Sequence, residues 1–167
     1  MKILLIALSL FTTTAFSQTV YLKGAPENLE SNKLIILKHE PVKITVDPKN
    51  SKEDKYIFHR QNNHNKVIKE SNKKLTVEAM KYPYQYALAT QSTYKSLAKA
   101  GYKYALISEV YKNNYLKKHP DEDVLIVFEY FIYDLNADLA YKVFELDEMK
   151  VYDSKLLIKK LRKAIDK

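Results

Sequence analysis

Three stretches in the second half of the chain have hydrophobic patterns that predict β-strands. Residues 102–110 alternate between apolar and polar after Gly101, and residues 139–146 alternate after a turn rich in Asp and Asn. Between them, residues 124–133 are almost continuously apolar and aromatic, interrupted only by Glu129. Such a run is typical of a central strand that is covered on both faces for part of its length.

Shorter patterns in the first half also favour strands. Residues 34–37 are apolar, residues 42–46 alternate as Val-Lys-Ile-Thr-Val, and residues 56–58 begin a further strand. The polar cluster at 61–65 predicts a turn, and residues 66–69 are the expected partner strand of a hairpin. The first half is thus predicted to be rich in β-structure.

Two other stretches have the period of an amphipathic helix. One has Pro83 in its first turn, runs to about Ala100 and ends at Gly101, where a left-handed C-cap is expected. The other begins at Asp153 or Ser154, whose side chains can cap its first turn. Its core-facing stripe consists of Leu157, Ile158, Leu161, Ala164 and Ile165.

The order of these elements predicts an α+β fold, with two helices packed on one face of a mainly antiparallel sheet. Residues 18–167 are long enough to form a single domain with its own hydrophobic core. Neither an internal repeat nor a low-complexity linker divides them.

The first 17 residues follow a different pattern. Lys2 supplies a positive charge, residues 3–10 are almost wholly apolar, and Ala15-Phe16-Ser17 places small residues at −3 and −1 of a cleavage point before Gln18. This layout predicts a cleaved secretory signal peptide over residues 1–17, so that the mature protein is periplasmic or extracellular. The alternative is a buried N-terminal strand or helix.

The absence of cysteine narrows the class of exported protein. It excludes disulfides, thiolate metal sites, a cysteine nucleophile and the lipid-modified cysteine of a bacterial lipoprotein. An exported domain without disulfides suits the bacterial envelope. After residue 17, no apolar run approaches the length of about 18 residues that a membrane span needs, so no transmembrane segment is predicted.

The formal net charge of +8 is compatible with an acidic partner such as nucleic acid, anionic lipid or an acidic glycan, but a lysine-rich surface that serves solubility is the favoured interpretation. Only Arg60 and Arg162 are arginines, whereas specific readout of phosphate or bases favours arginine, and export further disfavours nucleic acid. The charge is uneven: residues 154–167 carry six Lys or Arg against Asp166, while residues 121–150 carry nine acids against two Lys. The simpler interpretation of this alternation is that segments of opposite charge pack against each other.

Motifs for catalysis are scarce, so no catalytic residue and no cofactor is assigned. No GxSxG, HExxH, GxGxxG or GxxxxGK[ST] motif is present, and two glycines cannot build a phosphate-binding loop. The four histidines lack the spacing of a metal site on one helix or strand. Glu129 becomes a candidate general acid or base if it is buried, and is structural if it pairs with a lysine on a neighbouring strand.

The turn at Asp134, Asn136 and Asp138, followed by Glu145, matches four ligand positions of an EF-hand loop. However, Leu139 occupies the position of the sharp-turn glycine, and a strand follows instead of a helix. Because Asp and Asn are also the residues that a hairpin turn prefers, the turn interpretation is favoured. Asp134, Asn136 and Asp138 stay weak candidates, and no metal is predicted.

Tyrosine is unusually frequent, with 14 copies and no tryptophan. Tyrosine combines apolar area with one polar group and is favoured in binding surfaces. The alternative is a tyrosine-rich rim of the core. The predicted binding residues are Tyr82, Tyr84, Tyr86, Tyr111 and Tyr115.

Two hypotheses for the function follow. The first is an exported, non-catalytic binding or structural protein of the bacterial envelope that contacts a protein or an acidic polymer through a surface rich in Tyr and Lys. The alternative is a periplasmic hydrolase or lyase that acts on an acidic polymer. A basic binder of anionic membranes is a third interpretation, and it predicts steep loss of binding with added salt.

Overall fold

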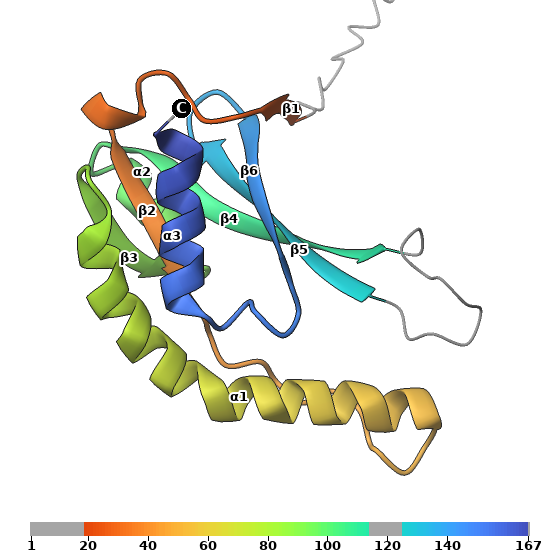
Figure 1. Ribbon diagram of the computed structural model, residues 1–167. Coiled ribbons are helices and arrows are strands. Elements are labelled where there is room, and N and C mark those ends of the chain that lie inside the picture. The colour runs from red at the N-terminus through yellow and green to blue at the C-terminus, as the bar shows by residue number, and fades with distance from the viewer. Residues whose placement is uncertain (1–18, 114–124, 167) are drawn as a thin grey trace, which may run out of the picture.

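The computed structural model describes residues 19–113 and 125–166, which form a six-stranded sheet and three helices (Figure 1). The predicted α+β class is confirmed, while the predicted signal peptide lies outside the described residues. The strands are β1 (Val20–Lys23), β2 (Lys33–Lys38), β3 (Tyr86–Thr90), β4 (Tyr102–Asn113), β5 (Leu125–Asp134) and β6 (Leu139–Asp147). The helices are α1 (Lys52–Glu78), α2 (Tyr94–Ala98) and α3 (Ser154–Ile165), and two 3₁₀ turns occupy Leu29–Ser31 and Ala79–Lys81.

The sheet has the strand order β1-β6-β5-β4-β2-β3 and is mixed. The ladders of β4 with β5 and of β5 with β6 are antiparallel and are the longest. The pairs β1–β6, β2–β3 and β2–β4 are parallel, which the prediction of a mainly antiparallel sheet does not include. The reason is that α1 joins β2 to β3 and α2 joins β3 to β4, and such crossovers return the chain in the same direction.

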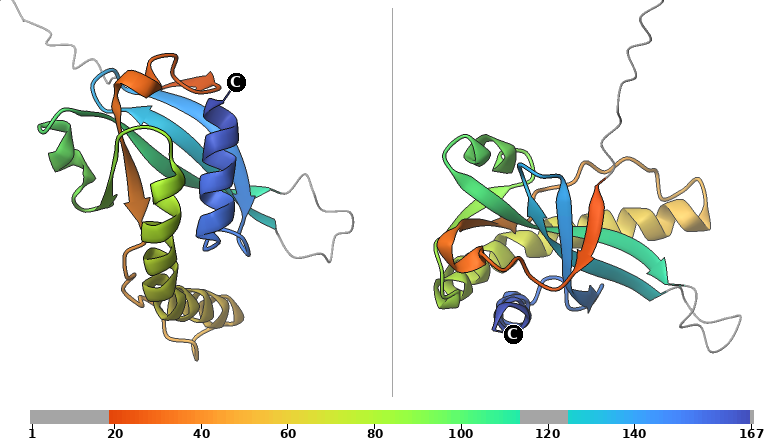
Figure 2. Two further views of the ribbon diagram at one scale, coloured as in Figure 1. Left: turned by 60° about the vertical axis from the view of Figure 1, so that its left-hand side comes forward. Right: turned by 90° about the horizontal axis from the view of Figure 1, so that it is seen from above.

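Two clusters of buried side chains cover the two faces of the sheet. The larger cluster joins Leu34 and Ile132 of the sheet to Leu75 of α1 and to the apolar stripe of α3. The smaller cluster joins Ile35 of β2 to Tyr94 of α2. Seen from above, α2 and α3 lie on opposite sides of the sheet (Figure 2).

Residues 52–78 form one helix of 27 residues, so the strands and turn predicted between residues 56 and 69 are wrong. The Ser51 hydroxyl caps the helix by accepting a hydrogen bond from Asp54 N at 2.9 Å. One row of α1 positions that contact the rest of the chain is spaced alternately four and three residues apart, as in a helix, but half of its members are polar. These positions are Ile57, Gln61, His64, Ile68, Ser71 and Leu75.

Residues 39–45, here called the strap, run beside α1 without joining the sheet, so the strand predicted at 42–46 is wrong. Side-chain amides of α1 hold the strap. Each amide oxygen accepts from a strap N–H at 2.9–3.2 Å, and each amide nitrogen donates to an oxygen of the same residue at 2.8–3.2 Å. These bonds satisfy backbone groups that a neighbouring strand would otherwise bind. The pairs are Asn72 with His39, Asn65 with Val42, and Gln61 with Thr45.

The helix predicted over residues 83–100 is also wrong. Residues 86–90 form β3 in parallel with β2, and only the five residues of α2 are helical. The sequence Tyr-Ala-Leu-Ala-Thr fits either period, and pairing with β2 decides the outcome because tertiary context overrides local propensity. Of the two helices predicted to pack on one face of the sheet, only the C-terminal helix, α3, forms as predicted. Gly101 does have the expected left-handed backbone, with φ of 84°.

The strongest hydrophobic patterns are predicted correctly. β2, β4, β5 and β6 occupy the stretches expected to be strands, and β5 lies in the interior of the sheet. Asp153 caps α3 by accepting from Leu156 N at 3.0 Å. In the stripe of α3, Leu157, Ile158 and Leu161 are buried, and Ala164 and Ile165 are half-buried.

A β-bulge in β6 changes which of its side chains face the core. Tyr130 of β5 is opposite Phe144, but the next residue, Phe131, is opposite Lys142, so β6 has one extra residue there. Simple alternation places Tyr141 and Phe144 on opposite faces, whereas both pack against the larger core. The Tyr130 and Phe144 rings stack with centroids 4.8 Å apart.

Replacing Asn72 by alanine removes both hydrogen bonds that hold His39 of the strap to α1. We expect the free energy of unfolding to fall by about 1–2 kcal/mol, because a part-buried backbone N–H and C=O lose their partners. Urea unfolding measures the change. Asn63 is exposed and forms no side-chain hydrogen bond within the described residues, so Asn63→Ala should cost less than about 0.5 kcal/mol. Equal losses in the two variants would contradict the role of Asn72.

Candidate functional site

Three of the five tyrosines predicted to bind a partner form a cluster at the rim of the core. The side chain of Tyr82 is 4% exposed, and its ring meets those of Tyr84 and Tyr86 edge to face at 5.7 and 6.1 Å. Tyr84 and Tyr86 are half-buried against the larger core cluster. Burial raises the pKa of Tyr82, whose hydroxyl has no hydrogen-bond partner among the described atoms. Tyr111 lies in β4, and Tyr115 lies outside the described residues.

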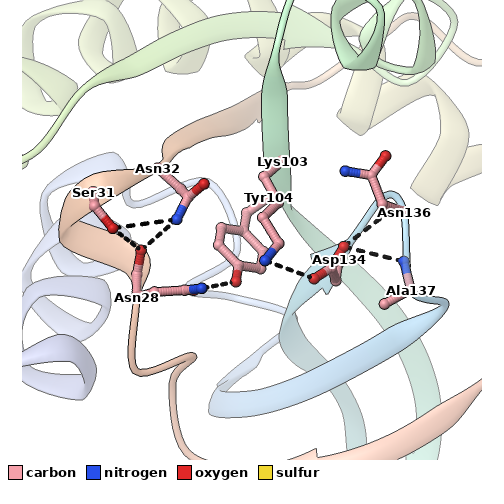
Figure 3. A network of polar contacts seen from close by, with 8 residues as sticks. All are labelled: Asn28, Ser31, Asn32, Lys103, Tyr104, Asp134, Asn136 and Ala137. Carbon is pink, nitrogen blue, oxygen red and sulfur yellow. Dashed lines mark hydrogen bonds and ion pairs between the residues drawn. The ribbon is translucent and has the colours of Figure 1, made fainter.

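The three weak metal candidates, Asp134, Asn136 and Asp138, lie in the β5–β6 turn. The carboxylates of Asp134 and Asp138 accept hydrogen bonds there. Buried Asp134 accepts from the backbone N–H groups of Asn136 and Ala137 at 2.9 and 3.1 Å (Figure 3). Asp138 accepts from the hydroxyls of Tyr133 and Thr19. Within the described residues, no group of three or more His, Asp or Glu side chains could hold a metal ion.

The same turn is tied to the 3₁₀ turn at Leu29–Ser31 through β4. Lys103 Nζ lies 3.6 Å from the Asp134 carboxylate and 5.1 Å from the centroid of the Tyr104 ring. The Tyr104 hydroxyl donates to the side-chain carbonyl of Asn28, and the backbone carbonyl of Asn28 accepts from the side chains of Ser31 and Asn32 (Figure 3). This network links three segments and gives Asp134 and Asn28 structural roles.

Glu129 pairs with a lysine on the neighbouring strand. This is the structural alternative to a role as general acid or base. Lys142 Nζ of β6 lies 2.7 Å from Glu129 and 2.6 Å from Glu145. Hydrogen bonds to Glu129 and Glu145 raise the pKa of Lys142. The half-buried Glu129 carboxylate is thus neutralised by a direct ion pair.

The structure brings together two of the four histidines, which the sequence does not predict. The strap carries His39 to α1, where its ring centroid lies 5.9 Å from that of His64 and 5.2 Å from that of Tyr152. Burial, followed by the charge of His64, lowers the pKa of His39 to about 4. His59 is exposed on α1, and His119 lies outside the described residues.

His64 uses both of its ring nitrogens in hydrogen bonds. Nε2 lies 2.7 Å from the Glu40 carbonyl, which can only accept, so Nε2 carries a proton. Nδ1 lies 2.8 Å from the Tyr152 hydroxyl. His64 therefore connects the strap to the turn before α3, and neither nitrogen is free to act on a substrate.

Three serines have a lysine three positions later, the spacing of a serine–lysine nucleophile pair. The Ser71 hydroxyl donates to the Tyr152 carbonyl, the Ser92 hydroxyl to the Glu40 carboxylate, and the Ser96 hydroxyl to the Thr93 carbonyl. Each hydroxyl proton is thus engaged by another acceptor, and none of the three serines is activated by its lysine in this arrangement.

A groove of about 560 Å³ between the end of α1 and α3 gathers five cations. We call it the cationic groove and define it by Lys81, Lys155, Lys159, Arg162 and Lys163, with Ile158 at its floor. Lys81 pairs with Glu78 at 2.7 Å, and Asp166 is the other acid of the lining. The four cations that α3 contributes to the groove are exposed and form no ion pair within the described residues.

Helix stability explains only part of this arrangement. Arg162 and Lys163 lie in the last turn of α3, where the helix dipole favours cations. Lys155 lies in the first turn, where the dipole disfavours a cation. The sequence contains one signal for the groove, the run of basic residues at 154–167, but does not indicate that Lys81 joins it.

Comparisons of the chain with protein-family models, with curated proteins and with solved structures find no match. The function must therefore be argued from the geometry. Within residues 19–113 and 125–166, no helix has the length and apolar character needed to cross a membrane.

Stability should fall as the pH drops through the range in which His39 titrates. The unfolded chain binds this proton near pH 6.5, whereas the folded chain binds it only near pH 4. Between these values the unfolded state holds more protons, so the free energy of unfolding decreases on acidification, by up to about 3 kcal/mol. Urea unfolding at pH 7, 5.5 and 4.5 measures this loss.

The His39→Gln variant should have a shallower dependence of stability on pH than the unaltered protein. His59→Gln is the matched control, because His59 is exposed on α1 and should leave the dependence unchanged. Parallel curves for the His39 variant and the unaltered protein would show that His39 does not carry the effect.

Proposed function

We propose that this protein is an exported, non-catalytic binding protein of the bacterial envelope that holds an acidic polymer in the cationic groove. The observation that carries the proposal is the set of four exposed cations on α3 without acidic partners among the described residues. The signal-like pattern of residues 1–17 and the absence of cysteine support the location.

The spacing of the cations favours a polymer over a single small anion. Lys155, Lys159 and Lys163 recur every four residues, so they lie on one side of α3 at intervals of about 6 Å. A linear polyanion with repeated carboxylate or phosphate groups can contact several of them at once. Lysine acts as a point charge without a fixed hydrogen-bonding geometry, which suits a repetitive partner.

The tyrosine part of the expected surface receives less support than the lysine part. Tyr82 is buried, and Tyr84 and Tyr86 present only part of their rings. We therefore assign the contact with the polymer to the cations.

The alternative function, a hydrolase or lyase acting on an acidic polymer, has one observation in its favour, the proximity of His39 and His64. Acid–base catalysis needs a group that is free to transfer a proton to or from the substrate. Both nitrogens of His64 are engaged and Glu129 is paired with Lys142, so of these three groups only His39 keeps ring nitrogens without a hydrogen-bond partner in the described residues. These contacts favour binding without turnover.

Reversing three charges of the groove should weaken binding to a carboxylate polymer. We expect the triple variant Lys155→Glu, Lys159→Glu, Arg162→Glu to bind polygalacturonate about tenfold or more weakly in 50 mM salt. The expected loss sums three surface charge pairs of about 0.5–1 kcal/mol each. Co-sedimentation with the polymer gives the affinity, and unaltered polymer length after incubation argues against the hydrolase or lyase.

The matched control reverses Lys66, Lys69 and Lys73, which are exposed on α1 and have no ion pair within the described residues. This variant has the same net charge as the groove variant but keeps the groove intact. It should therefore bind almost as well as the unaltered protein. Equal weakening in both variants would mean that net charge, and not the groove, attracts the polymer. Shortening of the polymer would support the catalytic alternative.

A further inference from the structure

A second hollow lies where two parallel strands end. β2 pairs with β4 only as far as Ile36 opposite Leu106, whereas β4 continues to Asn113. β3 and β4 lie on either side of β2, and the helices that connect them, α1 and α2, contribute to the clusters on opposite faces of the sheet. Such a point is a topological switch point, and ligands of open α/β sheets bind there, outside the carboxyl ends of the strands.

The hollow has a volume of about 560 Å³, which is within the range of small-molecule sites. Segments that are distant in sequence line it: the end of β2 with the strap, the turn before α2, and the middle of β4, with contributions from His64, Tyr130, Val151 and Leu157. Its lining combines polar groups with an apolar wall. The polar groups include His39, Glu40, Gln91, Ser108 and Glu109, and the wall includes Leu37, Tyr94 and Ile107.

Two carboxylates give this hollow the opposite charge to the cationic groove. Ser92 donates to both oxygens of Glu40, through its backbone N–H at 3.1 Å and through its hydroxyl. These hydrogen bonds lower the pKa of Glu40, which keeps it ionised. Glu109 accepts from the Tyr21 hydroxyl at 3.1 Å. Among the described lining residues, Lys38 adds one cationic side chain.

His39 adds an acceptor to the two carboxylates. Because its pKa is about 4, its imidazole is uncharged at neutral pH and does not offset their charge. Its ring nitrogens have no hydrogen-bond partner within the described residues, so the unprotonated one can accept a hydrogen bond from a ligand.

We propose that this hollow binds a primary ammonium group carried on a short aliphatic stem. Glu40 and Glu109 attract the positive charge, and a ring nitrogen of His39 accepts a hydrogen bond from the ammonium group. Tyr94 and Ile107 contact the aliphatic stem. A free diamine and a lysine side chain of a peptide share this chemistry. The site does not rest on the function of the cationic groove.

Titration of the isotope-labelled full chain with Nα-acetyl-lysine methylamide, followed by NMR, tests the proposal. We expect the amide signals of Gln91, Ser108 and Glu109 to shift. The norleucine analogue has the same stem without the charge and should cause no saturable shift. Tighter binding of 1,5-diaminopentane than of the lysine probe identifies a free amine as the ligand, and the reverse order identifies a peptide.

The double variant Glu40→Gln, Glu109→Gln should weaken the lysine probe about tenfold or more, because two charge-assisted contacts are lost. The single variant Glu109→Gln leaves the Ser92 contacts of Glu40 in place and should still weaken binding. Glu30→Gln, exposed on the 3₁₀ turn, is the control and should have no effect. All three variants should bind polygalacturonate normally, which separates this test from that of the groove.

Equal binding of the norleucine analogue, shifts confined to other surfaces, or unchanged affinity in both Glu109 variants would overturn the proposal. Absence of any shift up to about 20 mM probe would also overturn it. A dissociation constant above this concentration corresponds to a binding free energy of less than about 2.3 kcal/mol, which is too small for a dedicated site.

Discussion

Side-chain hydrogen bonds along α1 hold two backbone segments to one helix, and the positions of the candidate sites depend on them. Asn72 and Asn65 bind the strap. The Ser71 hydroxyl donates to the Tyr152 carbonyl in the turn before α3, and the hydroxyl of Ser154, the first residue of α3, donates to the Ser71 carbonyl. His64 lies between these two segments and bonds to both. Since α1 buries few side chains, these polar contacts, each worth about 0.5–1.5 kcal/mol net, replace much of the apolar contact that a helix normally makes. Figure 1 shows the consequence: the first half of α1 lies apart from the sheet, with the strap beside it.

Both hollows are consequences of this arrangement. The strap leaves β2 at Lys38 and is drawn toward α1 instead of continuing beside β4, which opens the hollow at the end of β2 and places His39 and Glu40 in its wall. The contacts of Ser71 with the 152–154 turn fix the start of α3 against α1. The buried stripe of α3 then turns its cations toward the end of α1, where Lys81 completes the cationic groove.

The accuracy of the sequence predictions follows the strength of the hydrophobic pattern. β5 and α3 are predicted closely because their apolar residues match one period and no other. α1 is missed because Gln61, His64 and Ser71 occupy positions that are apolar in an ordinary amphipathic helix, and their partners are backbone groups that a sequence does not reveal. β3 is missed because its alternating Ala and larger residues fit two periods, so that pairing with β2 decides. The basic run at 154–167 indicated one wall of the groove, whereas the hollow depends on the path of the strap and has no local signal.

The treatment of charge inside the sheet strengthens the assignment of the α3 cations to a partner. Cross-strand register places Glu109, Glu129 and Glu145 side by side on β4, β5 and β6, and like charges in such positions repel. Lys142 offsets this repulsion by contacting both Glu129 and Glu145. The fold thus compensates charges where packing brings them together, and Arg60 with Glu148 is a further pair. On α3, by contrast, Lys155 and Lys159 lie next to each other on one side, and neither forms an ion pair in the described part of the chain. Added salt relieves their mutual repulsion, and the proposed acidic polymer would relieve it in the same way and so stabilise the folded protein.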